Sequence, residues 1–331
     1  MTLIVKRLVR KLPILLGFIF VLLFATSIKD DFIGHIGKAE VNLTNITMNN
    51  SGLSGSNTTQ INMNTPLNNS IKHVIIIVME NKGYTQVIGS GNAPYQNQLA
   101  NNYASASKYY GVYPDSLPNY ISLISGYPYL TKDKDPDAIS PLKEHTIVNL
   151  LQSKNLSWKG YFEDMPQVCH LKDSGGSGFD LRNDDSCKNT VGLDEFYKDL
   201  SNQTIPNYSF IVPNNIHNTH DSTVTEGDHW LSNFVPKIIN SSKFNNTALF
   251  IVYDEGKKND KSGFGSGIYA VNGGQLPLLL VSPLANKGFV SSLEYTHYNL
   301  LTTVEKILNL GNLGKGDAAA KPMADLFRTL P

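Results

Sequence analysis

The sequence has no excess charge of either sign. Among its 331 residues, 28 Lys and Arg balance 28 Asp and Glu, so the formal net charge is zero. This balance excludes a whole-protein attraction to nucleic acid or to an anionic membrane surface, so attraction for a charged ligand has to be local. The chain also lacks a P-loop and a Gly-x-Gly-x-x-Gly after an apolar run, so nucleotide binding through those motifs is not indicated.

Cysteine is almost absent. Cys169 and Cys187 are the only two, and they lie in a segment rich in Gly, Ser and Asp. Outside the cell we expect them to pair, and the closed loop would contribute about 3 kcal/mol of stability. His170 is adjacent to Cys169, but this spacing is not that of a zinc site.

The amino terminus differs from the rest of the chain. Basic residues precede an uncharged stretch from Leu12 to Ile28. We expect residues 1–28 to be a signal peptide or an N-terminal membrane anchor, with the anchor slightly favoured. Either places the rest of the chain outside the cytoplasm, membrane-anchored or secreted. Residues 29–70 are rich in Asn, Ser and Thr and are predicted to be a disordered tether, which leaves 71–331 as the catalytic domain.

Ten Asn-x-Ser/Thr sequons agree with an external location, although an Asn-rich chain also produces them by chance. They begin at Asn42, Asn45, Asn49, Asn57, Asn68, Asn155, Asn202, Asn207, Asn240 and Asn245.

From residue 72 onward, short apolar runs alternate with segments of helical periodicity. This pattern predicts an α/β fold, a three-layer α/β/α sandwich with a mainly parallel central sheet. The clearest strands are expected at 74–79, 208–212, 248–253 and 276–281, with weaker ones near 157–162 and 105–112. Helices are expected at about 94–103, 118–125, 146–154, 228–240, 297–310 and 321–328.

Polar side chains follow three of the predicted strands. These are Glu80 and Asn81 after the first, His217, His220 and Asp221 after the second, and Asp254 and Glu255 after the third. In open α/β sheets the ligand crevice lies outside the carboxyl ends of the strands. Carboxylates gathered there repel one another unless a cation neutralises them, and oxygen with imidazole ligands suits a divalent ion. Each group alone could also be a helix cap or face solvent.

The stretch "YPDSLPNYISLISG" offers a candidate nucleophile. Pro118 suits the first turn of a helix, so Ser116 and Asn119 lie at its N-terminus, where free N–H groups favour an anion such as phosphate. A metal-bound Ser116 hydroxyl could attack phosphorus. The ordinary alternative, that Ser116 only caps the helix, is equally compatible with the spacing.

Three further residues are candidates near the site. His297 opens a strongly amphipathic helix and is either a metal ligand or an exposed neutral residue. His217 and Asp228 are candidates for orienting the ligands, although Asp228 could simply be a carboxylate in the first turn of a helix.

Eight blocks of the sequence, in order, resemble the phosphoesterase family, which groups non-haemolytic phospholipases C with metal-dependent acid phosphatases inside the alkaline phosphatase superfamily. The similarity runs from about residue 72 to 314. The blocks are "HVIIIVMENKGYTQVIG", "SLPNYISLISG", "WKGYFEDMP", "FIVPNNIHNTHD", "GDHWLSNFVPKI", "FIVYDEG", "PLLLVSP" and "THYNLLTTVEKILNLG".

The resemblance implies a role for most of these residues. Glu80, Asn81, Asp254 and Glu255 look like metal ligands of the family, and His297, which we favour as a further ligand, resembles the histidine before its last core helix. Ser116 matches the nucleophile and Asn119 an asparagine that contacts the phosphoryl oxygens. "PNNIHNTHD" departs from the commoner form, with His217 and Asn218 where Asn and Asp are expected, so His220 and Asp221 are the ligand candidates there.

The sequence thus predicts an extracytoplasmic phosphoesterase that uses divalent metal ions of unknown number and identity and forms a phosphoserine at Ser116. Its expected partners are a phosphate-ester substrate and, through the N-terminal segment, a membrane, with no nucleic acid. Two alternatives stay open, a phospholipase C or phosphoinositide phosphatase acting on lipid headgroups, and a tethered cell-surface binding domain without chemistry. A Ser-His-Asp hydrolase is disfavoured because no Gly-x-Ser-x-Gly surrounds Ser116.

Overall fold

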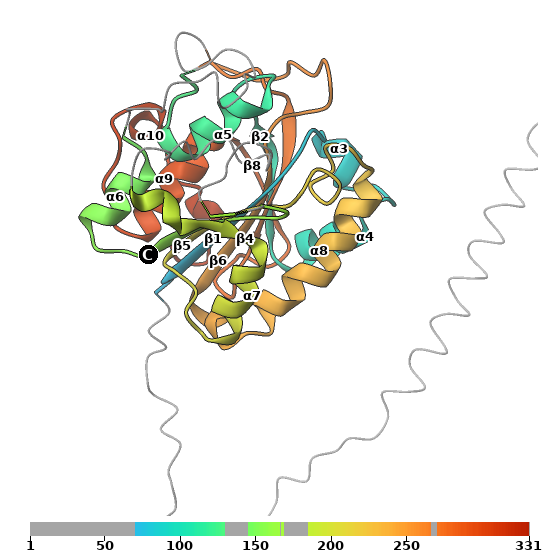
Figure 1. Cartoon of the computed structure of the whole chain (residues 1–331). Helices are drawn as coiled ribbons and strands as arrows, with labels where there is room; N and C mark the ends of the chain where they lie inside the picture. Colours follow the sequence, from blue (N-terminus) through green and yellow to red (C-terminus); the bar gives the residue numbers. More distant parts are fainter. Residues whose placement is uncertain (1–69, 130–144, 166, 169–184, 266–269, 331) are drawn as a thin grey trace, which may run out of the picture. The chain divides into compact units, whose positions relative to one another are not determined.

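A computed structural model describes residues 70–129, 145–165, 167–168, 185–265 and 270–330 of the chain (Figure 1). These residues belong to a compact unit that begins at Pro66. The predicted membrane segment, the tether up to residue 69 and Cys169 lie outside the described residues, so the anchor, the tether and the disulfide stay predictions. Within the described ranges, no helix combines the length and the apolar character that a bilayer span requires.

One sheet organises this unit. Its eight strands are β1 (His73–Met79), β2 (Ala104–Tyr110), β3 (Trp158–Phe162), β4 (Thr190–Gly192), β5 (Tyr208–Val212), β6 (Thr247–Tyr253), β7 (Gln275–Val281) and β8 (Phe289–Thr296). Their order across the sheet is β4-β3-β5-β1-β6-β7-β2-β8. All run parallel except β7, which is antiparallel to β6 and β2. The sheet therefore has a carboxyl edge, where seven strands end, and an amino edge, where those seven begin.

Helices cover both faces of the sheet. They are α3 (Tyr84–Val87), α4 (Pro94–Asn102), α5 (Ser116–Ser125), α6 (Ile147–Ser153), α7 (Leu193–Ser201), α8 (Val224–Ile239), α9 (His297–Ile307) and α10 (Gly316–Ala319). The short 3₁₀ turns are η2 (Asp185–Asn189), η3 (Ser242–Asn246) and η5 (Ala324–Leu326). In Figure 1, α4, α7 and α8 lie on one side of the sheet and α5, α6, α9 and α10 on the other. The predicted three-layer sandwich is confirmed.

The central strands explain why the sheet forms. Every residue of β6 and all but the first of β1 are buried, as expected for strands covered by helices on both faces. Their β-branched and aromatic residues suit this position. On one face, Phe196 of α7 packs against Phe234 of α8 with ring centroids 5.3 Å apart.

The six predicted strands are confirmed to within two residues at each end. The helix expected at 321–328 is wrong, because this segment contains only η5 and then forms a backbone bridge from Phe327 to Ala285. Contacts with the β7–β8 loop override its local helical pattern. Sequence reasoning missed β4, β8 and α7. Strand β8 is an edge strand whose exposed and buried residues do not alternate regularly.

Candidate active site

Glu80 and Asp254 lie side by side at the carboxyl edge because β1 and β6 are neighbours. Met79 and Tyr253, the last residues of these strands, are paired in register. The N–H of Asp254 donates to the Met79 carbonyl (3.0 Å), which continues the ladder one step beyond the strands. Both carboxylates are buried, with 3% of Glu80 and none of Asp254 exposed. The buried sheet thus delivers two negative charges to one place.

Only one of the two carboxylate oxygens of Asp254 has hydrogen-bond partners in the part of the chain that the structure describes. Its Oδ1 accepts the N–H groups of Asn81 (3.1 Å) and Glu255 (2.6 Å). Its Oδ2 is buried without a hydrogen-bond partner among the described residues. Burial, and then the nearby charge of Glu80, raise the pKa of Asp254 well above its ordinary value. A buried carboxylate oxygen with no donor, next to a second carboxylate, is the environment that a bound cation would relieve.

Ser116 is the point on which three segments of the chain converge. It is the first residue of α5. Its hydroxyl lies 3.2 Å from Glu80 Oε2, 3.4 Å from Asn81 Oδ1 and 3.5 Å from Glu255 Oε1. The sequence prediction that the tips of β1 and β6 meet the start of α5 agrees with this geometry. Ser116 opens a ten-residue helix, so its hydroxyl lies at a helix N-terminus, the end of the helix dipole that favours an anion.

The loop before Ser116 is held by Asn119 and by glycine packing. Asn119 Oδ1 accepts from Val112 N (2.8 Å), and its Nδ2 donates to the carbonyls of Tyr113 and Asp115. The backbones at Gly111 and Gly273 approach so closely that a Cβ on Gly273 would lie 2.5 Å from the Gly111 carbonyl carbon. This contact presses the Ser116 loop against the segment that follows Glu255.

Asn119 therefore differs from the expectation that it contacts phosphoryl oxygens. Its side chain is fully buried and both ends of its amide are used inside the loop. In this arrangement Asn119 positions Ser116 rather than the substrate.

Two residues near the carboxylates were not found from the sequence. The Tyr120 hydroxyl donates to Glu80 Oε1 (2.6 Å), which leaves Oε2 for Ser116. Lys82 donates to the Thr219 carbonyl (2.6 Å), and its partial burial lowers its pKa against the opposing pull of Asp254 and Glu80. A tyrosine in a buried helix gives no sequence signal of function, whereas Lys82, two residues after Glu80, could have been considered.

His297 lies behind Asp254 and is fully buried. Its Nε2 is 2.7 Å from the Asp254 backbone carbonyl, and its Nδ1 is 2.8 Å from the Tyr109 hydroxyl. Because a carbonyl can only accept, Nε2 carries the proton and Nδ1 accepts from Tyr109. Burial lowers the pKa of His297 to about 4. Both ring nitrogens are occupied, so this geometry favours a positioning role over the expected metal ligand.

The histidines after β5 lie apart from the carboxylates that surround Ser116. His220 Nδ1 is 2.6 Å from Asp221 Oδ1 at the surface, and this hydrogen bond lowers the pKa of Asp221. His217 Nδ1 is 2.8 Å from Glu163 Oε2, and its ring stacks on Trp230. Each histidine is paired with its own carboxylate, and the ligand role expected for His220 and Asp221 stays a prediction without support from their contacts.

The backbone of this β5 loop does reach the site. Asn218 accepts the N–H of Glu80 (2.8 Å), and the Thr219 hydroxyl donates to the Glu80 carbonyl (2.6 Å). The loop therefore fixes Glu80 through main-chain contacts.

Asp228 lies elsewhere. Its two oxygens accept the backbone N–H groups of Tyr95 (3.0 Å) and Gln96 (2.9 Å) at the start of α4. This is the geometry of a helix cap supplied by another helix. The contacts give Asp228 a structural role and none in orienting metal ligands.

The donor set around Ser116 fits a hard divalent cation in its chemistry. It offers carboxylate oxygens from Glu80, Asp254 and Glu255, an amide oxygen and a hydroxyl. The orphaned Asp254 Oδ2 is the strongest sign of such an ion. Even so, no three His, Cys, Asp or Glu side chains in the described ranges already surround a common metal position.

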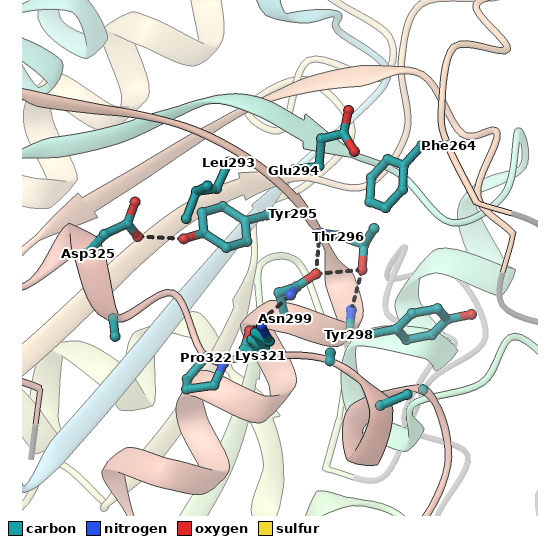
Figure 2. Close-up of a pocket in the computed structure, with 14 residues that line it drawn as sticks. Phe264, Leu293, Glu294, Tyr295, Thr296, Tyr298, Asn299, Lys321, Pro322 and Asp325 are labelled. Atoms are coloured by element: carbon teal, nitrogen blue, oxygen red, sulfur yellow. Dashed lines mark hydrogen bonds between the residues drawn. The ribbon is translucent and has the colours of Figure 1, made fainter.

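Three cavities formed by described residues lie beside β8, α4 and α9. Figure 2 shows one of about 660 Å³ beside β8, with Phe264, Tyr295 and Tyr298 among its lining residues. There the Tyr295 hydroxyl donates to Asp325 Oδ1 (2.5 Å). Two others enclose about 520 and 300 Å³. None of these three is lined by Ser116 or the carboxylates around it.

Comparison with known proteins agrees with the fold and identifies the family. Residues 89–311 match the Phosphoesterase family, so the chain belongs to the phosphoesterase family, a class of enzymes that hydrolyse phosphate esters. The resemblance read from the sequence blocks is confirmed.

Two curated relatives share more than a quarter of their aligned residues with this chain. A phosphatidylinositol-3-phosphatase of Mycobacterium tuberculosis is 28% identical over 77% of this chain and 82% of its own length. A probable acid phosphatase of Kluyveromyces lactis is 27% identical over 76% of this chain and 61% of its own length. The chain thus spans about three fifths of the yeast protein.

A solved structure supports the fold. A protein in the alkaline phosphatase superfamily from Vibrio parahaemolyticus superimposes with a TM-score of 0.53 and 15% identity, covering 78% of this chain and 72% of that one. The alkaline phosphatase-like architecture predicted from the sequence is therefore confirmed at the level of the fold.

Proposed function

We propose that this protein is an extracytoplasmic, metal-dependent phosphoesterase that hydrolyses phosphomonoesters as acid phosphatases do, with Ser116 as the nucleophile. The observation that carries the proposal is the convergence of Glu80, Asn81 and Glu255 on the Ser116 hydroxyl at the start of α5. The extracytoplasmic location rests on the uncharged Leu12–Ile28 stretch and its basic flank.

Residues from three segments would hold the metal. Glu80, Asn81, Asp254, Glu255 and Ser116 supply its oxygen ligands, while His220, Asp221 and His297 are left out because their contacts lie elsewhere. When bound, a divalent cation polarises phosphoryl oxygens and lowers the pKa of a serine hydroxyl.

The chain's own groups perform the remaining work. The Ser116 hydroxyl loses its proton to water and its Oγ bonds to phosphorus, while the bond from phosphorus to the leaving oxygen breaks and that oxygen takes up a proton from water. A second water then cleaves the phosphoserine, which releases inorganic phosphate and returns a proton to Ser116. The positive end of the α5 dipole, at Ser116, favours the negative charge that builds on the phosphoryl oxygens. Asn119 holds the loop that places Ser116, and Tyr120 keeps Glu80 turned toward it.

Replacement of Ser116 tests the proposal. Ser116→Ala should abolish turnover of an aryl phosphate while keeping the fold by circular dichroism and the metal content by elemental analysis. Ser122→Ala is the matched control, because Ser122 lies in the same helix but donates to the Pro118 carbonyl. Activity in Ser116→Ala equal to that of the control would end the assignment.

A phosphoinositide phosphatase is the second candidate, favoured by the mycobacterial relative's name. A phospholipase C on the same scaffold would release a phosphorylated headgroup instead of inorganic phosphate. Measuring which product is released from phosphoinositide vesicles separates the two from each other, and from an enzyme that acts on soluble monoesters alone. A binding domain without chemistry is not favoured, because the nucleophile and the acidic groups around it are all present.

A further inference from the structure

The sequons of the catalytic unit gather at one edge of the sheet. Five Asn-x-Ser/Thr sequences begin in the described residues, and each lies in a connection that enters a strand. Asn155 precedes β3, Asn202 and Asn207 precede β5, and Asn240 and Asn245 precede β6. Because β3, β5 and β6 are parallel, all five lie at the amino edge, opposite Ser116.

Asparagine content does not explain this placement. Loops at the carboxyl edge also carry asparagines, and none of these has Ser or Thr two residues later. They include Asn92, Asn214, Asn215, Asn259 and Asn272. These carboxyl-edge loops therefore contain asparagines but no acceptor sequence.

Four of the five asparagines are available for modification. Asn155, Asn202, Asn240 and Asn245 are exposed, and no hydrogen bond of their amide side chains occurs among the described residues.

Asn207 is the exception. It is half-buried, its Nδ2 donates to the Lys72 carbonyl (3.1 Å), and its Oδ1 accepts from Ser157 N (3.0 Å). A glycan on this nitrogen would compete with contacts that join the starts of β1, β3 and β5. Asn207 is therefore an internal control, a sequon that we expect to stay unmodified.

We propose that Asn155, Asn202, Asn240 and Asn245 carry N-linked glycans, which cover the amino edge and leave the catalytic edge open. In the transfer, the amide nitrogen bonds to the anomeric carbon of a sugar on a lipid-linked phosphate donor supplied by the cell. The bond from that carbon to phosphate breaks, and the amide loses one proton. The inference rests on the extracytoplasmic location in the proposed function and not on its chemistry.

Peptide mass spectrometry of the full chain purified from the cells that make it tests the proposal. We expect glycan masses on the four exposed asparagines and none on Asn207 or Asn214. Bare peptides at all four exposed positions overturn the proposal. Glycan on Asn207 at the same level as on the exposed asparagines overturns the argument that exposure decides which asparagines are modified. An aryl phosphate assay on the same preparation reports separately on the proposed chemistry.

Two kinds of variant test the separation of the edges. Asn240→Gln and Asn245→Gln should each remove one glycan mass and leave kcat/KM for aryl phosphate unchanged. Lys261→Thr is the opposite variant, which adds a glycan acceptor at Asn259 in the loop after Glu255. A glycan there should lower kcat/KM, most for bulky substrates. The proposed separation of a glycosylated edge from a catalytic edge is overturned by either of two results. One is a fall in kcat/KM when the amino-edge glycans are removed, and the other is an unchanged kcat/KM when Asn259 carries a glycan.

Discussion

The two edges of the central sheet follow opposite chemistry. The carboxyl edge buries Glu80 and Asp254 next to each other and leaves Asp254 Oδ2 without a partner. The amino edge instead carries basic residues at strand starts, in loops and in the last turns of helices. Among the described residues these include Lys72, Lys154, Lys237, Lys243, Lys287, Lys306 and Arg328. Lysines at helix ends favour the helix dipole, so the amino edge contributes to stability.

This difference shows how a chain of zero net charge can still attract a charged ligand. At the carboxyl edge Lys82 interacts electrostatically with Asp254 and Glu80, but these two buried carboxylates outnumber it. The proposed cation would offset the electrostatic cost of these carboxylates, in keeping with perturbed charges being concentrated at functional sites. Mutations should therefore have unequal effects on the two edges, and the following predictions run from the largest expected effect to the smallest.

The largest effect is expected from Asp254→Asn. The change removes a negative charge from the proposed metal site, and kcat/KM should fall by about a thousandfold or more, equivalent to about 4 kcal/mol of transition-state stabilisation. Without divalent cations the variant should melt at a higher temperature than the wild type, because repulsion from Glu80 is gone. Added cation should raise the melting temperature of the wild type only.

Asp228→Asn is the matched control, since this carboxylate is also buried but accepts two N–H groups at the start of α4. Its loss should cost about 1 kcal/mol of stability, as for a helix cap, and leave kcat/KM unchanged. Equal activity loss in both variants would contradict the assignment of Asp254.

His297→Gln should have the next largest effect. The imidazole joins Tyr109 to the Asp254 carbonyl, so its removal leaves buried polar groups unpaired and should cost about 1–3 kcal/mol. We expect a lower kcat with the metal content retained, because His297 acts through the position of Asp254. Loss of the metal in elemental analysis would restore His297 as a ligand.

Asp254 and His297 show which features of the site can be predicted from the sequence and which cannot. The pairing of Glu80 with Asp254 follows from apolar strands that end in carboxylates and from the rule for open sheets, so it could be predicted. The side-chain directions of His297 and Asn119 depend on hydrogen-bond partners far away in the sequence. Residue type and position identified both as important but could not distinguish contact with a ligand from support of its neighbours.

The amino-edge half of α9 contains a different buried carboxyl, Glu305, which is 2% exposed. Burial and then Asp317 raise its pKa from an ordinary 4.5 to about 9. Both Glu305 oxygens are buried without a hydrogen-bond partner among the described residues, while Asp317 accepts the N–H groups of Leu313 and Lys315, so the neutral, protonated form of Glu305 is favoured. The folded state therefore binds this proton more tightly than the unfolded state does.

The sign of the pH dependence follows from this. The contribution of Glu305 to stability is fully present below pH 4.5, declines as the unfolded state ionises, and is lost as pH rises through about 9. Glu305→Gln removes this titration, so it should be more stable than the wild type near pH 8 and comparable near pH 5. Thermal unfolding at these two values measures the difference. An identical pH profile in both proteins would show that Glu305 is ionised when folded.

The smallest effect is expected from helix caps, and it still separates the site from its scaffold. Thr146 and Thr296 both cap helices by accepting a backbone N–H, from Val148 in α6 and from Tyr298 in α9. Replacing either with Ala should cost about 1 kcal/mol, read as a modest drop in melting temperature. Only Thr296→Ala should also lower kcat, because the helix that it caps begins with His297 and so helps to hold Asp254. Equal kcat values in the two variants would mean that the start of α9 does not transmit its position to the site.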